Sequence, residues 1–208
     1  MTTRCAIEIL GRLKKFTRNM PETMMASIID TYGKDPYLIL VSCLLSLRAR
    51  DTQTLPVCHT LFKKVRSPQG LLTLPLSELE SILYSLGFYK QKAKTLKSIS
   101  LELINRFNGI VPHTEEKLLS IKGIGRKTAN LILASAFEIP AICVDVHVHR
   151  IANMLGMVNT KTPHETEIAL RQLLPKDRWT ECNSLFVKLG QNVRVSDILS
   201  IFNKIETS

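Results

Sequence analysis

The stretch Ile121-Lys122-Gly123-Ile124-Gly125-Arg126-Lys127 decides how the rest of the sequence is interpreted. It lies between two segments with helical patterns, and its glycines let backbone N–H groups approach an anion because no Cβ stands in the way. Lys127 falls just inside the second helix, where the positive end of the helix dipole opposes its ammonium form. Partial burial would act in the same direction and favour a nucleophilic amine. The stretch therefore indicates a phosphate site beside a reactive lysine, although an ordinary interhelical turn with a solvated lysine explains it equally well.

The composition agrees with a globular protein that binds an acidic partner. The 208 residues, 45% of them hydrophobic, suffice for one large or two small domains with a core. The formal net charge is +10, and the basic residues are spread along the chain instead of forming a tail. A folded basic surface suits DNA or RNA. Charge alone leaves open the simpler interpretation of a soluble basic protein.

Several classes of protein do not fit the sequence. The longest apolar run, residues 37–47, contains Ser42 and Ser46 and is far shorter than the roughly 20 residues of a membrane span. The N-terminus lacks a signal-peptide pattern, so we expect a cytoplasmic location, associated with the nucleoid, or a nuclear one if the organism is eukaryotic. The five cysteines are scattered, with no spacing typical of a disulfide framework or a zinc site. Most of them are expected to be buried as small hydrophobic residues.

Helix start and stop signals recur along the chain and predict an all-α fold of about ten short helices. Asp35-Pro36 starts the first helix as N-cap and first helical residue, and Ser77 with Glu80 forms a capping box for a short helix that ends at Gly87. The other signals include Thr114 as a cap before the glycine turn and Thr162-Pro163 near the end. The expected helices span 36–47, 52–65, 77–87, 90–107, 114–121, 126–137, 144–155, 162–174, 179–189 and 195–205.

Two motifs together point to a known family. The run Leu118-Leu119-Ser120-Ile121-Lys122-Gly123-Ile124-Gly125-Arg126-Lys127-Thr128-Ala129-Asn130 is followed by Val144-Asp145-Val146-His147-Val148-His149-Arg150. With this pair the sequence resembles the endonuclease III branch of the helix-hairpin-helix DNA glycosylases. Three upstream stretches fit the same family: Leu44-Leu45-Ser46, the nearby Asp51, and Gly87-Phe88-Tyr89 with Lys92-Ala93. The likeness covers about residues 32–190.

The resemblance implies two helical domains. A six-helix barrel would span 29–139 and contain the helix-hairpin-helix at about 114–137. A discontinuous second domain, without an iron–sulfur cluster, would combine 1–28 with 140–208. The resemblance places Lys127 and Asp145 across the cleft between the two domains. The expected partner is damaged double-stranded DNA, bound by a monomer that does not associate with membranes.

The catalytic pair implied by the resemblance is Lys127 and Asp145. The family lysine attacks C1′ of a damaged nucleotide, and its Schiff base permits β-elimination at the abasic site, because only nitrogen forms an iminium electron sink. The carboxylate of Asp145 would stabilise oxocarbenium character at C1′ and shuttle protons. Asp145 is also placed to cap the helix that begins near Val146, and both roles can hold together.

The resemblance also implies DNA contacts outside the catalytic pair. The hairpin would anchor a phosphate through Gly123, Ile124, Gly125 and Arg126. Arg48 occupies the position of a polar wedge that is usually glutamine, and Phe88 that of an apolar wedge. For Phe88, a core aromatic beside a helix end is a comparable alternative. His147 matches a position near the cleft, but helix packing explains it equally well.

The C-terminal part departs from the family pattern. Most endonuclease III relatives hold a [4Fe–4S] cluster with four closely spaced cysteines, whereas Arg194 stands roughly at the first ligand here and no cysteine follows Cys182. We therefore expect no iron–sulfur cluster and no other metal or cofactor. The 195–205 segment would close its domain by apolar packing through Val195, Ile198, Leu199 and Ile205.

The leading functional interpretation is a glycosylase with abasic-site lyase activity, acting on oxidised pyrimidines such as thymine glycol. One alternative keeps the glycosylase but changes its substrate to a mismatched uracil or thymine, or to oxidised guanine. Monofunctional relatives tend to lack the hairpin lysine, which argues against it. An alternative of another class is a non-catalytic DNA-binding protein that retained the hairpin.

Overall fold

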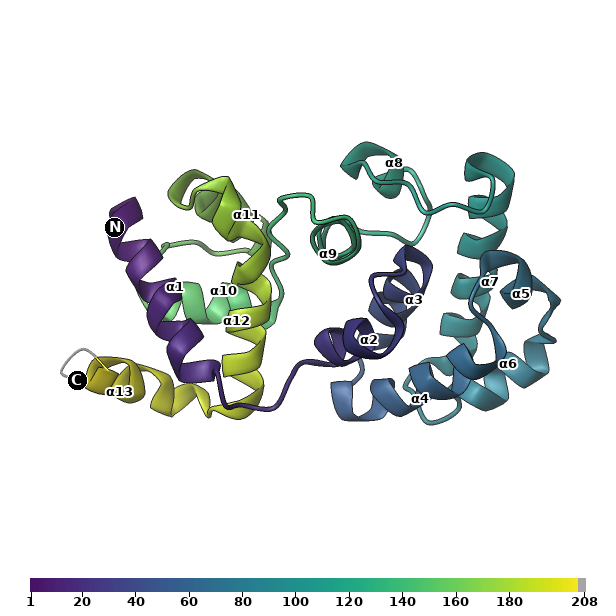
Figure 1. Cartoon of the computed structure of the whole chain (residues 1–208), viewed down its shortest axis with the longest axis horizontal. Coiled ribbons are helices and arrows are strands. Elements are labelled where there is room, and N and C mark those ends of the chain that lie inside the picture. Colours follow the sequence, from purple (N-terminus) through teal and green to yellow (C-terminus); the bar gives the residue numbers. More distant parts are fainter. Residues whose placement is uncertain (206–208) are drawn as a thin grey trace. The chain divides into compact units, whose positions relative to one another are not determined.

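The regular structure of residues 1–205 is entirely helical. The computed structural model describes the backbone of these residues and, in the last helix, the side chains up to Ser200 and that of Phe202. No β-strand occurs in this described part, so the predicted all-α class is confirmed. The elements in chain order are α1 (Thr3–Thr17), α2 (Met24–Tyr32), α3 (Pro36–Ser46), α4 (Asp51–Lys64), α5 (Pro68–Thr73), α6 (Leu76–Leu83), α7 (Tyr89–Phe107), α8 (Glu115–Leu119), α9 (Arg126–Ala136), α10 (Val146–Met154), α11 (Pro163–Leu173), the 3-10 helix η1 (Lys176–Arg178), α12 (Trp179–Asn192) and α13 (Val195–Ile205) (Figure 1).

The helices fall into two compact units. Unit 1 combines Met1–Thr23 with the residues from Glu138 onward, and unit 2 is Met24–Phe137. Unit 2 therefore contains α2 to α9, and unit 1 contains α1 and α10 to α13. The chain begins in unit 1, forms all of unit 2 and then returns to unit 1.

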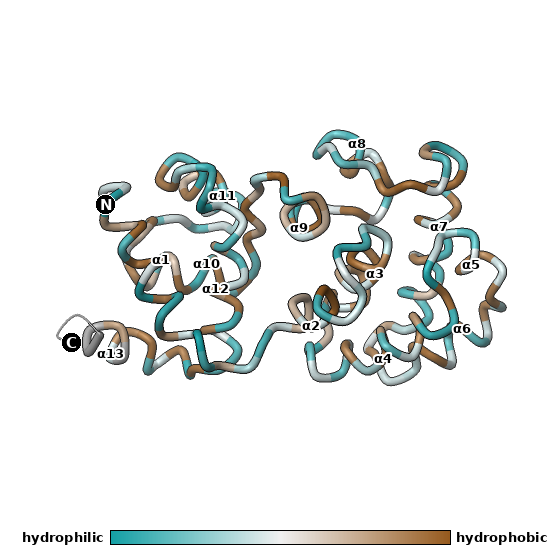
Figure 2. The backbone as a smooth tube through the Cα atoms, viewed as in Figure 1, coloured by the Kyte–Doolittle hydropathy of each residue, from teal (hydrophilic) through white to brown (hydrophobic). Residues whose placement is uncertain are grey.

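Helix α3 forms the centre of unit 2. Its residues from Tyr37 to Leu45 are all buried, and most of the helix is hydrophobic (Figure 2). A helix that is apolar all round needs neighbours on every side, and α3 packs against α2, α4, α7 and α9. Its start follows the sequence signal, since Asp35 accepts hydrogen bonds from the N–H groups of Tyr37 (2.9 Å) and Leu38 (3.0 Å). The core helix thus supports α9, which carries Lys127.

Most predicted helices are present, and the errors have local causes. The prediction of a capping box at Ser77 and Glu80 is wrong. Helix α6 begins at Leu76, its N-cap is Pro75, and no side chain caps it. The carbonyl of Pro75 accepts the first helical bond, from the N–H of Leu79 (3.0 Å), so the helix starts before Ser77 can cap it. Three α-helices, α1, α2 and α5, and the short 3-10 helix η1 were not predicted.

Helix α13 packs on the core of unit 1 with a face that differs in part from the expected one. Ile198 is buried, as expected, but Leu199 is 45% exposed and Val195 is only partly covered. The second buried residue is Phe202, which lies one helical turn after Ile198 and joins the same core cluster. The guanidinium of Arg12 lies 5.7 Å from the centroid of the Phe202 ring. The side chain of Ile205 lies outside the described residues.

The cysteines behave largely as expected. Four are buried and Cys5 is exposed. Burial raises the pKa of Cys58 to about 11, which keeps this thiol protonated at neutral pH. Cys182 is fully buried in the core cluster of unit 1 and its pKa is raised by the same desolvation. These buried thiols act as small hydrophobic residues.

Candidate functional site

The hairpin of unit 2 joins α8 to α9. Thr114 starts α8 by accepting a hydrogen bond from the N–H of Lys117, as predicted. The turn that follows is anchored by Ile121 and Ile124, which are buried, and the N–H of Ile124 donates to the carbonyl of Ile121 (3.1 Å). Gly123 has a φ of +102°, and a Cβ there would lie 3.4 Å from side-chain atoms of Thr95 and Ile99 in α7. The backbone conformation therefore favours glycine at this position, whereas a Cβ would make little more than ordinary van der Waals contact with α7.

The start of α9 is open to a ligand. Its N-cap is Gly125, no side chain caps it, and a Cβ at Gly125 would meet no atom within 4 Å. Helix N-termini of this kind bind anions through their N–H groups and dipole. Arg126 is engaged across the hairpin, with Nη1 2.8 Å from Oε1 of Glu115. An ion pair this exposed contributes at most about 1 kcal/mol, so a phosphate can displace the carboxylate.

Lys127 is the second residue of α9, and its side chain is exposed. The partial burial that the sequence analysis considered is therefore not present in this structure. Further along α9, Ala129, Ile132 and Leu133 are buried and hold the helix in place. Lys127 thus projects from a rigid helix whose other face packs on α3.

Asp145 belongs to unit 1 and is the N-cap of α10. Its Oδ1 accepts hydrogen bonds from the N–H groups of His147 and Val148, both at 2.9 Å. The capping alternative for Asp145 is therefore confirmed. Within the described part of the chain Oδ2 accepts no hydrogen bond, so one carboxylate oxygen remains available for other chemistry. The preceding segment is held by Asn183 of α12, whose side-chain amide donates to the carbonyl of Cys143 (3.0 Å).

His147 faces α12 within unit 1. A Cβ added to Gly190 would lie only 2.2 Å from Nδ1 of His147, so α12 approaches the imidazole as closely as a glycine permits. This geometry supports the packing alternative for His147. Gly190 was not among the expected site residues, because its role depends on two helices that are far apart in the sequence.

Arg48 and Phe88 lie together in unit 2. The guanidinium of Arg48 is 5.8 Å from the centroid of the Phe88 ring. Both residues have left-handed backbone conformations, with φ of +54° and +60°. Phe88 is 65% exposed, so the alternative of a core aromatic is wrong. A further exposed aromatic that the sequence analysis missed, Tyr84, packs edge-on against Tyr89 with ring centroids 5.2 Å apart.

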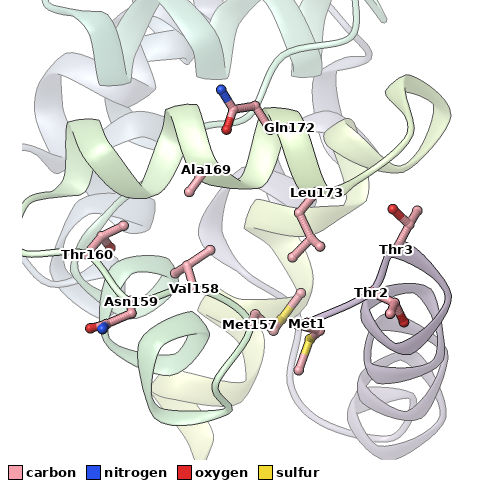
Figure 3. A pocket seen from close by; sticks show the side chains of 10 residues that line it. All are labelled: Met1, Thr2, Thr3, Met157, Val158, Asn159, Thr160, Ala169, Gln172 and Leu173. Carbon is pink, nitrogen blue, oxygen red and sulfur yellow. The ribbon is translucent and has the colours of Figure 1, made fainter.

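A separate cavity in unit 1 contains none of the expected site residues. It has a volume of about 450 Å³ and lies between the start of α1, the segment after α10 and helix α11 (Figure 3). Apolar side chains of Met157, Val158 and Leu173 and polar ones of Thr2 and Gln172 line it. It brings no cluster of charged or nucleophilic groups together, and we assign it no part in the site.

Among the helices of residues 1–205, none combines the length and the apolar character needed to cross a membrane.

Comparison with known proteins gives one consistent family. Residues 41–176 match the model of the HhH-GPD superfamily base excision DNA repair protein. The chain is 42% identical over 189 residues to endonuclease III of Thermotoga maritima, a match that covers 90% of this chain and 84% of the relative.

Solved structures agree with these sequence matches. A non-covalent endonuclease III–DNA complex is similar with a TM-score of 0.81 and 30% identity, over 92% of this chain and 86% of that one. A trapped endonuclease III–DNA covalent intermediate is similar with a TM-score of 0.78 and 30% identity, over 92% of this chain and 87% of that one. With its glycine hairpin and the segment that bears Asp145 both in place, the chain belongs to the HhH-GPD superfamily of base excision DNA repair proteins and, within it, to the endonuclease III family.

Proposed function

We propose that this chain removes oxidised pyrimidines, such as thymine glycol, from duplex DNA and cleaves the resulting abasic site through a Schiff base on Lys127. The observation that carries the proposal is a single arrangement in unit 2. Lys127 is an exposed residue in the second position of α9, directly after an N-terminus that no side chain caps. An anion-binding helix start beside an amine suits attack on a sugar next to a phosphate.

The amine would carry out both chemical steps. Nζ of Lys127 forms a bond to C1′ while the bond from C1′ to the base breaks, and the base leaves with the electron pair and takes up a proton. Nζ then loses a proton, and its lone pair forms a C=N bond to C1′ while the bond from C1′ to the ring oxygen O4′ breaks. O4′ keeps the electron pair and takes up a proton, which leaves an iminium ion. Removal of a 2′ proton then expels the 3′ phosphate, and water releases Lys127 by hydrolysis.

Asp145 would support the same reaction from α10. Positive charge develops on the sugar as the base departs, and a nearby carboxylate stabilises that charge. Oδ1 is occupied by the two cap hydrogen bonds, which leave Oδ2 for this task and for moving protons. The cap thus orients the carboxylate that the chemistry uses.

The remaining contacts would position the DNA. Gly123, Ile124, Gly125 and Arg126 hold a phosphate without reading the sequence. The target base must leave the stack, which costs a few kcal/mol, and the exposed pair of Arg48 and Phe88 would fill the vacated space. His147 would support α10 beside Asp145. We propose that the chain acts as a monomer on damaged DNA inside the cell.

Borohydride trapping on a panel of duplexes with single lesions tests this function. We expect a covalent protein–DNA adduct with an abasic site and with thymine glycol, because borohydride reduces the Schiff base to a stable amine. Excision of one mismatched uracil or thymine, or of oxidised guanine, with no reaction at thymine glycol would assign a different substrate. Salt-sensitive binding to every duplex without any turnover would identify a non-catalytic DNA-binding protein.

We also propose that the chain works without an iron–sulfur cluster. The residues present do not fit such a cluster, since Arg194 stands at the position expected for the first cysteine ligand. Cys182 is fully buried in the core of unit 1, to which α13 contributes Ile198 and Phe202. We expect the active protein to contain no stoichiometric iron and Phe202→Ala to destabilise it by about 3 kcal/mol, the scale for removing a buried aromatic side chain. Iron analysis and denaturant unfolding measure both, with the exposed Leu199→Ala as the control. Iron at four atoms per chain would refute the proposal.

A further inference from the structure

Helix α7 carries a lysine whose ammonium group is bound to the end of another helix. Lys92 is only 9% exposed, and its Nζ donates to the carbonyl of Leu45 (2.8 Å) and to that of Leu47, with the carbonyl of Leu44 at 3.5 Å. These carbonyls belong to the last turn and C-cap of α3, where no intrahelical partner is available. A cation there satisfies several of them at once and complements the helix dipole.

The same residue also holds the start of its own helix. The backbone N–H of Lys92 donates to the carbonyl of Phe88 (2.9 Å), the N-cap residue of α7. Its side chain meanwhile holds Leu47, the neighbour of Arg48. The two segments lie close together, since a Cβ on Gly87 would be 3.9 Å from the carbonyl oxygen of Arg48. Lys92 thus joins the two segments that carry Arg48 and Phe88.

Arg48 and Phe88 both have left-handed backbone conformations, which need support from the surrounding structure. Left-handed φ values are unfavourable for residues with a Cβ and are kept only where the surroundings impose them. Phe88 has no side-chain cap hydrogen bond at the start of α7, and Arg48 is exposed. Contacts with the surrounding structure must therefore support them. Lys92 contributes on both sides: its ammonium group binds the carbonyl of Leu47, next to Arg48, and its backbone N–H makes the first helical hydrogen bond of α7 with the carbonyl of Phe88.

We propose that Lys92 is a positioning residue for base extrusion: its ammonium group holds the end of α3 so that Arg48 and Phe88 can enter the DNA stack together. This inference rests on the proposed function, in which those two residues replace the departing base. Without the ammonium group, the carbonyls at the end of α3 would have to hydrogen-bond to water instead. The segment around Arg48 would then no longer be held in its left-handed conformation. Extrusion of a stacked base should then suffer more than chemistry at a sugar that has already lost its base.

The test compares Lys92→Met with a matched variant on the same helix, Lys97→Met. Lys97 makes the equivalent contact elsewhere, donating to the carbonyls of Leu72 (2.9 Å) and Leu74 at the end of α5. Burial lowers the pKa of both lysines, so the two variants remove the same kind of partly desolvated cation. Single-turnover rates are measured for excision of thymine glycol from a duplex and for cleavage of a preformed abasic site.

We expect Lys92→Met to slow excision by about 10-fold to 100-fold relative to cleavage of the abasic site, the scale of a small misplacement of positioning groups. Lys97→Met should change the two rates equally. Lys92→Arg, which keeps a cation, should restore most of the ratio. If Lys92→Met does not fold, Lys92→Gln serves in the same comparison.

Equal slowing of both steps in Lys92→Met, as in Lys97→Met, would overturn the positioning role while leaving the proposed function intact. A wild-type chain that cleaves neither substrate would instead overturn the proposed function, and the positioning role with it.

Discussion

Substitution of Lys127 by glutamine is expected to abolish the borohydride-trapped adduct and to lower the cleavage rate at an abasic site by about 10³-fold or more, the scale for removing a covalent nucleophile. Glutamine has a similar reach and is a good helix former, but its amide nitrogen cannot form an iminium ion. Because Lys127 is exposed at the start of α9, the change should leave folding almost unaffected. Gel electrophoresis after reduction measures the adduct.

The matched control is Lys122→Gln in the same hairpin. Lys122 is also exposed, and its backbone N–H donates to Oε2 of Glu102, so the side-chain change does not disturb the turn. It removes the same charge from the DNA-binding surface without removing the proposed nucleophile. We expect weaker binding at high salt but an unchanged adduct yield at saturating protein. An undiminished adduct in Lys127→Gln would exclude Lys127 as the nucleophile.

Local chemistry explains why so much of the fold could be predicted from the sequence. Asp35-Pro36, Thr114 and Thr162-Pro163 each start a helix in the structure as expected. A cap is a hydrogen bond between residues two or three positions apart, so the pattern and its structural result lie in the same short stretch. The glycine hairpin follows the same logic, and these signals fix where α9 begins and therefore where Lys127 stands.

The features that escaped prediction depend on contacts between distant segments. The contact between Lys92 and Leu45 spans 47 positions. The family resemblance included Lys92-Ala93 but gave no partner for the lysine side chain, because that partner lies on a distant helix. In the sequence, Gly190 looks like any other glycine within a helix. Only the structure shows the imidazole of His147 packed closely against it. The left-handed conformation of Phe88 likewise has no local signal, because residues with a Cβ seldom adopt it. Packing decides each of these cases.

The buried face of α13 was predicted correctly only in part, also because packing decides it. Ile198 and Leu199 are adjacent and equally apolar, so hydrophobicity alone favours both. A helix turns by about 100° per residue, and only one of two neighbours can face the core fully. In the structure Ile198 and Phe202 face the core, and Leu199 is exposed.

The exchange of Asp145 for asparagine is expected to separate its structural role from its chemical one. Asparagine caps helices about as well as aspartate, and its side-chain oxygen can accept the same bonds from the N–H groups of His147 and Val148. Stability should therefore change by less than about 0.5 kcal/mol. The neutral amide cannot stabilise an oxocarbenium ion or accept a proton, so the excision rate should fall by about 10²-fold to 10⁴-fold.

Asp35→Asn provides the control for this exchange. Oδ1 of Asp35 makes the same two cap hydrogen bonds, to the N–H groups of Tyr37 (2.9 Å) and Leu38 (3.0 Å) at the start of α3. We expect this variant to keep both its stability and its activity, since it alters a cap of identical geometry away from the proposed chemistry. Single-turnover excision and denaturant unfolding are measured on both variants. If Asp145→Asn is as active as Asp35→Asn, Asp145 is only a helix cap and another group must balance the charge on the sugar.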